Sequence, residues 1–256
     1  MNIVGIIPAR MGSSRFPGKP LANIHGIPMI GHVYFRSKMA KILDDVYVAT
    51  CDQEIIDYIK SIDGKAIMTD TSHERASDRT SEALNIIESR TEQKTDIIVM
   101  LQGDEPMILP EMIDAAVQPL LDDQSVTVSN LMATIKKIEE WEDPNEVKVV
   151  VDKENFAIYF SREPIPSKRK YSSEIKAYKQ VCVIPFTRDC LINYTRLEPT
   201  PLEIIESVDM NRFIENGIKI KMIETDNNTI AVDTPQDLAN VERLMKNDSL
   251  IRTYLN

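Results

Sequence analysis

Short apolar runs alternate with amphipathic segments along the first hundred residues. The runs are rich in Ile and Val and too short for helices, which is typical of buried parallel strands; they lie over residues 2–8, 45–50, 65–68 and 96–101. Helical periodicity lies between them, over residues 29–41, from an N-cap at Asp52 to about residue 62, and over 78–88. This alternation predicts an α/β fold with a Rossmann-like, doubly wound, mostly parallel sheet.

The pattern changes in the middle of the chain. Strand-like runs separated by turn signals cover residues 125–135, 147–152, 156–160 and 178–186, and a segment rich in Pro, Ser and Lys over 164–176 indicates a loop. Helices are expected over 187–196, 201–216 and 234–245, with a strand over 219–224. We therefore expect one domain over residues 1–256 with a β-rich subregion around 125–186, a mixed-sheet extension or flap.

Composition narrows the classes of function. The chain has 256 residues, 43% of them hydrophobic and 27% charged, and a net charge of −10, which disfavours general nucleic-acid binding. Its three cysteines lack metal-ligand spacing, and no apolar run is long enough to span a membrane. We expect a protein of the reducing cytoplasm with no membrane segment.

A basic loop follows the first predicted strand, against the acidic sign of the whole chain. The stretch PARMGSSRFPGKPL carries Arg10, Arg15 and Lys19, with Gly12 and Gly18 between them. Open α/β sheets bind ligands at the carboxyl ends of their strands, and arginine forks, lysine and glycine-rich backbone suit phosphate oxygens. The spacing matches neither the Walker nor the dinucleotide pattern. It predicts a triphosphate site; a solvated basic loop is the alternative.

Two acidic residues follow apolar runs. Asp104 lies in LQGDEPMI, just beyond the strand expected over 96–101, and Asp233 lies in IAVDTPQDL before a predicted helix. Taken alone, Asp104 reads as a turn or cap residue and Asp233 as a helix cap. Together with a phosphate loop, two carboxylates at this edge favour Mg²⁺, which binds hard oxygens and shares coordination with phosphates.

These motifs together resemble one family. PARMGSSRFPGKPL, HGIPMIGHV, QGDEPMI, PNEVKVV, YFSREPIP, PLEIIE and VDTPQDL occur in the order seen in the CMP-Kdo synthetases, the 3-deoxy-manno-octulosonate cytidylyltransferases. The likeness covers nearly the whole chain. It implies transfer of CMP from CTP to a 2-keto-3-deoxy sugar acid with release of pyrophosphate, for surface polysaccharide or lipopolysaccharide synthesis. The family's common homodimer, formed through its β-rich middle, is implied as well.

The resemblance also implies roles for individual residues. Arg10, Arg15 and Lys19 would act on the triphosphate as catalytic residues, and Asp104 and Asp233 would hold Mg²⁺. The acceptor, a small acidic sugar, would meet Gln102, Arg162, Gln180 and Glu206. The implied nucleotide-binding set is Pro8, Ala9, Arg10, Gly12, Ser13, Lys19, Arg79 and Asp104. Plain structural roles compete at three of these positions: a strand-end salt bridge for Arg162, and a helix-surface charge for Arg79 and Glu206.

The chain departs from the family mainly in its acceptor half. ASDR stands where the family has SGT-[DE]-R, and QVCVIPF replaces a strand of the form HxGIYGY, so Gln180 takes the place of a His and Phe186 that of a Tyr. Ile204 stands where a His is expected, and DNNTIA replaces a Gly-bearing turn. A site that bonds a hydroxyl discriminates strongly when a partner is missing. We therefore expect CTP to be retained and the acceptor to be a modified Kdo, an amino analogue or a phosphonate.

Two other functions stay open at this point. A nucleotide-binding module without transferase activity would use the same loop, although such a module has little need for two metal carboxylates. A nucleotidyltransferase acting on a sugar phosphate would keep the fold and take another acceptor and probably another base. Nucleotide preference and the effect of removing Asp104 or Asp233 separate these readings.

Overall fold

A computed structural model describes residues 1–12, 15–167, 176–227 and 229–254. The chain divides into two compact units, Met1–Asp114 with Thr229–Asn256, and Ala115–Asn228. The single domain expected over residues 1–256 stays a prediction. No helix of the described residues is long and apolar enough to cross a bilayer.

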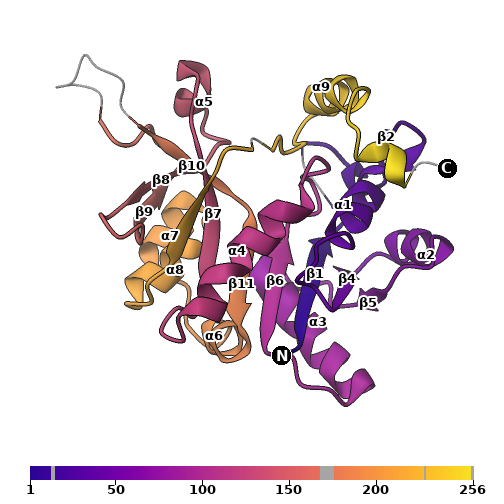
Figure 1. Cartoon of the computed structure of the whole chain (residues 1–256), viewed down its shortest axis with the longest axis horizontal. Coiled ribbons are helices and arrows are strands. Elements are labelled where there is room, and N and C mark those ends of the chain that lie inside the picture. Colours follow the sequence, from indigo (N-terminus) through magenta and orange to yellow (C-terminus); the bar gives the residue numbers. More distant parts are fainter. Residues whose placement is uncertain (13–14, 168–175, 228, 255–256) are drawn as a thin grey trace. The chain divides into compact units, whose positions relative to one another are not determined.

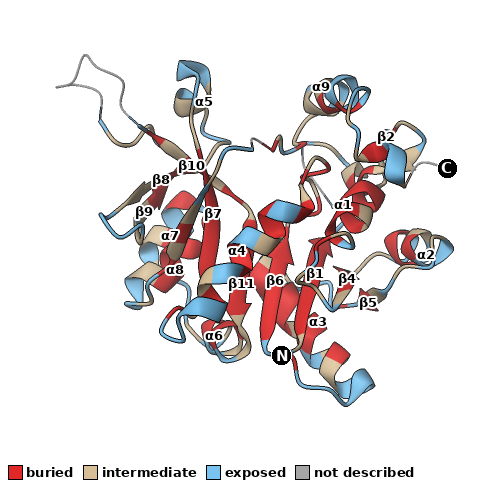
Figure 2. Cartoon of the chain, viewed as in Figure 1, coloured by how far each residue is buried: buried red, intermediate tan, exposed pale blue. Residues whose placement is uncertain are grey.

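The first unit is built on a parallel sheet (Figure 1). Its strands stand in the order β6-β1-β4-β5, and they are Ile97–Leu101, Ile3–Ala9, Asp45–Thr50 and Ala66–Met68. Every residue of β1 and β6 is buried (Figure 2), as expected for parallel strands covered on both faces. The doubly wound α/β prediction is confirmed for this unit.

The strand order creates a switch point beside β1. The chain moves from β1 to β4 and β5 on one side, through helices α1 (Met29–Ser37) and α2 (Gln53–Ser61). It then returns through α3 (Ala76–Thr91) to β6 on the other side of β1. Right-handed crossovers in opposite directions put α3 on the opposite face from α1 and α2. The loops after β1 and β6 therefore diverge at the carboxyl edge, where open sheets of this kind bind ligands.

The last residues of the chain complete the first unit. Helix α9 (Pro235–Met245) and the 3-10 turn η2 (Ile251–Thr253) follow Thr229. A buried apolar cluster joins this segment to the start of the chain; it contains Ile24, Met29, Val232, Val241, Met245 and Ile251. The smaller elements of the unit are the 3-10 turn η1 (Lys19–Leu21) and the short antiparallel pair β2 (Asn23–Ile24) and β3 (Ile27–Pro28).

The second unit contains a mixed sheet, in agreement with the β-rich middle expected from sequence. Its order is β12-β7-β10-β8-β9, with strands Lys221–Thr225, Ser129–Thr134, Tyr178–Val181, Lys148–Val151 and Ala157–Ser161. β12 runs parallel to β7, and the other neighbouring pairs are antiparallel. The remaining elements are α5 (Ile138–Glu142), β11 (Val183–Thr187), α6 (Arg188–Tyr194), α7 (Pro201–Glu206) and α8 (Met210–Glu215).

Several element boundaries differ from the sequence-based expectation. The run over 178–186 is two strands, β10 and β11, and the helix over 201–216 is two helices that end and begin around Ser207 in the left-handed region (φ 53°). Helix α4 (Pro110–Asp122) was not anticipated, because Pro119 lies inside it and proline usually ends a helix. The loop expected over 164–176 lies largely outside the described residues.

Candidate active site

The basic loop begins directly at the carboxyl end of β1. Ala9 is the last strand residue and Arg10, which is exposed, is the first loop residue. The Gly18 N–H donates to the Met11 carbonyl at 3.1 Å, so the two ends of the loop meet. Gly18 has φ +73°, a left-handed conformation that favours glycine. Because the loop closes in this way, Lys19, the first residue of η1, lies at the carboxyl edge of the sheet.

The QGDEP loop leaves the neighbouring strand β6 at the same edge. A Cβ added at Gly103 would lie 3.1 Å from the Pro8 carbonyl oxygen, so glycine allows the close approach of the two strand ends. The next residue, Asp104, accepts a hydrogen bond on its main-chain oxygen from the Val232 N–H at 2.9 Å. This bond places the segment before α9 beside Asp104.

Helix α9 is capped by Thr234 and not by Asp233. The Thr234 hydroxyl accepts from the Asp237 N–H at 3.2 Å, and the Asp237 carboxylate accepts from the Thr234 N–H at 2.8 Å. This is a reciprocal capping box. The ordinary cap reading of Asp233 is therefore wrong, and its carboxylate is directed elsewhere.

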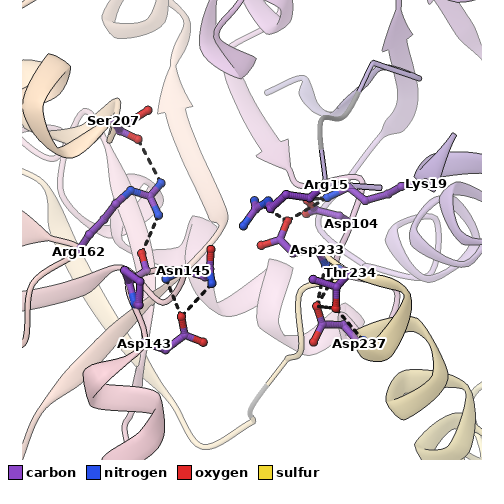
Figure 3. A network of polar contacts seen from close by, with 11 residues as sticks. Arg15, Lys19, Asp104, Asp143, Asn145, Arg162, Ser207, Asp233, Thr234 and Asp237 are labelled. Carbon is purple, nitrogen blue, oxygen red and sulfur yellow. Dashed lines mark hydrogen bonds and ion pairs between the residues drawn. The ribbon is translucent and has the colours of Figure 1, made fainter. Parts of the chain in front are cut away.

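The two acidic residues share one ammonium group (Figure 3). Lys19 Nζ lies 2.7 Å from Asp104 Oδ2 and 3.2 Å from Asp233 Oδ1, and Arg15 Nη2 lies 2.9 Å from the same Asp233 oxygen. The two carboxylate oxygens are thus at most about 6 Å apart, the sum of the two Lys19 distances. Burial by itself lowers the pKa of Lys19, but Asp104 and Asp233 together raise it above its usual value.

Arg15, Lys19 and Asp104 line a cavity of about 340 Å³. Its wall combines the ends of β1 and β6, the basic loop and the start of α3. The lining residues are Pro8, Ala9, Arg10, Gly12, Arg15, Lys19, Pro20, Met29, His73, Glu74, Arg75, Ala76, Arg79, Gln102, Gly103 and Asp104. Most residues of the predicted nucleotide-binding set, together with Gln102, therefore meet in one cavity; Ser13 lies outside the described residues.

Arg79 shapes the wall of this cavity. It is only 3% exposed, and its guanidinium donates to Thr69 Oγ1 at 2.5 Å, to the Asp70 carbonyl at 3.2 Å and to the His73 carbonyl at 3.2 Å. These hydrogen bonds tie the Arg79 side chain to the segment that precedes α3. The helix-surface alternative considered for Arg79 is wrong, because the residue is buried.

Two of the predicted acceptor residues are bonded to each other in the second unit. The Glu206 carboxylate accepts from the Tyr159 hydroxyl at 2.6 Å, the Ser161 hydroxyl at 2.8 Å and the Arg162 N–H at 2.8 Å. Burial by itself raises the pKa of Glu206, but these hydrogen bonds lower it below its usual value. Glu206 is 8% exposed, so the exposed-charge alternative is wrong.

The Arg162 side chain is held by main-chain carbonyls of the same unit (Figure 3). Its guanidinium donates to Glu206 O at 2.7 Å, to Pro144 O at 2.9 Å and to Ser207 O at 3.4 Å. These acceptors are main-chain carbonyl oxygens and not carboxylates, so the hydrogen bonds differ from the strand-end salt bridge considered as the alternative. The role of Arg162 toward an acceptor stays a prediction.

The exchanged positions of the acceptor half have differing environments. Gln180 Nε2 donates to Asn130 Oδ1 at 2.6 Å. Phe186 is fully buried and stacks on Phe213, with ring centroids 5.6 Å apart. Ile204 is 61% exposed. Phe186 is therefore a core residue, whereas Gln180 keeps a polar partner inside its unit.

Sequence reasoning missed two charged residues of the cavity, Glu74 and Arg75. Arg75 lines it at the N-cap position of α3, because the helix begins two residues before the expected start at 78. The spacing of Arg75 and Arg79, one helical turn apart, is the signal that would have placed both on one side of the helix start.

Comparison with known proteins agrees with this geometry. The family described as Cytidylyltransferase matches residues 4–220. The chain belongs to this cytidylyltransferase family. A 3-deoxy-manno-octulosonate cytidylyltransferase of Geobacter metallireducens is 42% identical over 251 residues, covering 94% of this chain and 96% of that one. Its counterpart from Geotalea uraniireducens is 43% identical over 257 residues, covering 96% and 100%.

One solved structure agrees with this family, and a second shares the fold. A CMP:2-keto-3-deoxy-manno-octonic acid synthetase complexed with CTP superposes with TM-score 0.86 at 39% identity, over 96% of this chain and 99% of that one. The 4-diphosphocytidyl-2C-methyl-D-erythritol synthase of Anaerococcus prevotii has TM-score 0.61 at 14% identity, over 96% and 98%, which shows the fold alone. The resemblance to the CMP-Kdo synthetases seen in the motifs is confirmed, and this cytidylyltransferase is a nucleotidyltransferase enzyme.

Proposed function

We propose that this cytidylyltransferase transfers CMP from CTP to Kdo or a Kdo-like 2-keto-3-deoxy sugar acid and releases pyrophosphate. The observation that carries the proposal is the Lys19 ammonium, at the end of the basic loop, in contact with both Asp104 and Asp233. Such a site combines cations for a triphosphate with paired carboxylates for a divalent metal. Relatives at 42% and 43% identity carry the name of this activity.

The donor set suits Mg²⁺. Both carboxylates are partly exposed, 26% for Asp104 and 23% for Asp233, and both contact the same Lys19 ammonium. Proteins commonly bind Mg²⁺ through one or two carboxylates, with substrate phosphates and water completing the shell. Charge balance favours the same ion, because Asp104 loses its cation if Lys19 turns toward the triphosphate.

The protein groups act by positioning and by neutralising charge. Arg10, Arg15 and Lys19 bind the triphosphate and stabilise the charge that develops on the pyrophosphate as it leaves. Asp104 and Asp233 would hold the metal, which would neutralise charge on phosphate oxygens. Pro8 and Ala9, at the end of β1, and Gly12, in the basic loop, contribute backbone to the wall of the cavity. This mechanism needs no covalent intermediate with the protein.

Nucleotide preference tests the proposal. Saturating CTP with Mg²⁺ should raise the unfolding temperature, since binding to the native state at 100 times the dissociation constant stabilises by about 2.7 kcal/mol. UTP, ATP and GTP at equal concentration serve as matched controls. Equal stabilisation by all four nucleotides would contradict the proposed selective use of CTP.

A second candidate keeps CTP and changes the acceptor. It is favoured by the exchanged positions, since Gln180 bonds to Asn130 and Ile204 presents an exposed apolar side chain. Pyrophosphate release with Kdo, an amino analogue of Kdo, a phosphonate and a sugar phosphate decides between the candidates. Fastest turnover with Kdo itself would remove the altered-acceptor proposal.

Other properties follow from the family resemblance. We expect a cytoplasmic homodimer that contacts neither nucleic acid nor membrane. Sedimentation velocity tests the dimer, and a monomer at micromolar concentration would contradict it.

A further inference from the structure

The carboxylate of Asp52 binds the basic loop from outside the cavity. Asp52 stands at the N-cap position of α2, yet its side chain makes no capping hydrogen bond there. Its Oδ2 accepts from the main-chain N–H of Met11 at 2.7 Å. The cap expected from sequence is thus only a main-chain position, and the side chain serves another element.

Strand register explains why these two residues meet. β1 and β4 are parallel neighbours, with Ala9 opposite Thr50 at their carboxyl ends. Met11 and Asp52 each lie two residues beyond that pair. The Asp52 N–H is itself held by the hydroxyl of Thr50, at 3.1 Å, and Thr50 is fully buried. The carboxylate is therefore oriented by the sheet before any ligand binds.

Met11 is the closing residue of the basic loop. Its N–H donates a hydrogen bond to the Asp52 carboxylate, and its carbonyl accepts one from the Gly18 N–H at 3.1 Å. Arg10 precedes it directly, and Lys19 follows Gly18 directly. The anchored Met11 thus fixes the position of the backbone from which the Arg10 and Lys19 side chains extend.

We propose that Asp52 is a positioning residue of the nucleotide site, which holds the basic loop through Met11 in the shape that binds a triphosphate. The proposal rests on the function proposed above and extends it to a residue that does not line the cavity. A preorganised loop binds its ligand more tightly because less ordering accompanies binding.

Electrostatics alone predicts the opposite effect. A carboxylate beside a basic loop repels a triphosphate, so its removal should strengthen CTP binding. Anchoring predicts that Asp52→Ala weakens CTP binding about tenfold, the equivalent of about 1.4 kcal/mol. Asp52→Asn loses the same charge but keeps an acceptor oxygen for the Met11 N–H, so it should bind CTP at least as well as the wild type.

The experiment measures CTP affinity by calorimetry with Mg²⁺ and no acceptor, on full-length variants whose folding is checked by circular dichroism. Glu54→Ala is the matched control, since it removes an exposed carboxylate two residues along, in the first turn of the same helix. The expected result is weak binding by Asp52→Ala alone. Wild-type affinity in Asp52→Ala, or equal weakening in Asp52→Asn, would overturn the anchoring.

Hydrogen exchange separates this proposal from the function on which it rests. In the ligand-free protein, Asp52→Ala should accelerate amide exchange in peptides that cover residues 10–18, whereas Asp52→Asn and Glu54→Ala should not. Unchanged exchange in Asp52→Ala overturns the anchoring whatever the ligand. Failure of the wild type to bind CTP, with the exchange difference present, overturns the function and leaves the anchored loop.

Discussion

The charged groups of the two units are held in different ways. In the first unit, Lys19 and Arg15 contact carboxylates that are 23% to 26% exposed, beside an open cavity. In the second unit, Lys148 is fully buried and donates to three main-chain carbonyls, those of Asp143 (2.7 Å), Glu146 (2.6 Å) and Arg162 (2.5 Å).

The difference separates groups that can change partners from groups that cannot. A partly exposed ion pair contributes little to stability and can exchange one partner for a phosphate or a metal. A buried ammonium surrounded by carbonyls is fixed, since any movement leaves a buried charge and several part-buried acceptors without their hydrogen bonds. The first pattern is typical of a reacting site, and the second of a framework that supports one.

The largest effect is expected from variants of the cluster of Lys19, Asp104 and Asp233, whose ion pairs can exchange partners. Asp104→Asn or Asp233→Asn should lower kcat by about 1000-fold, because each removes one of two charged metal ligands while keeping side-chain size. CTP affinity without acceptor should change only moderately, since the cations of the loop remain. Asp57→Asn, an exposed residue on α2, is the control. Turnover near the wild-type rate in either variant would contradict the metal assignment.

The next largest effect is a loss of stability on removing the Lys148 ammonium, which is fixed by three carbonyl oxygens. Lys148→Met should lower the free energy of unfolding by about 3 kcal/mol, because three part-buried carbonyl oxygens lose their donor. Urea denaturation measures the loss, and the exposed Lys153→Met should stay within about 0.5 kcal/mol of the wild type. If both variants were equally stable, the ammonium would not be structural.

A smaller effect is expected where a fixed group borders the cavity. Arg79→Lys keeps the charge but cannot reproduce a planar fork that serves Thr69, Asp70 and His73. The KM for CTP should rise about tenfold with kcat nearly unchanged, since a wall of the cavity loosens. Arg90→Lys, exposed near the end of the same helix, is the control. A loss confined to kcat would place Arg79 at the reacting phosphate.

The smallest effect is a pH dependence in the second unit. The pKa of Glu206 lies below its usual value of 4.5 in the folded protein, so its ionised form stabilises the fold above that value, and the contribution disappears as the pH falls through the folded pKa. Glu206→Gln should be less stable by about 1 kcal/mol at pH 7. The difference from the wild type should shrink below pH 4.5, and unfolding at several pH values measures it.

Glu198→Gln, at an exposed position before α7, provides the comparison for that series. It should match the wild type throughout. A Glu206→Gln difference that grows with acidity would contradict the assigned hydrogen bonds to Tyr159 and Ser161.

Local patterns in the sequence determined the sheet and the list of candidate residues. The apolar runs predicted β1, β4, β5 and β6 to within two residues, and the basic loop and the two acids were found from their place after such runs. Strand hydrophobicity and loop charge are properties of short segments, which is why the linear chain reveals them.

Only the tertiary structure decided which polar groups face one another. Asp233 and Asp52 both read as helix caps, yet capping by Thr234 frees the first for Lys19, and strand register turns the second toward Met11. The sequence left Arg162 open between an acceptor ligand and a strand-end salt bridge, and Glu206 between an acceptor ligand and a surface charge; the structure shows each held by hydrogen bonds inside its unit. A short polar side chain has several possible partners of similar energy, and the partner it takes depends on long-range contacts that no local pattern contains.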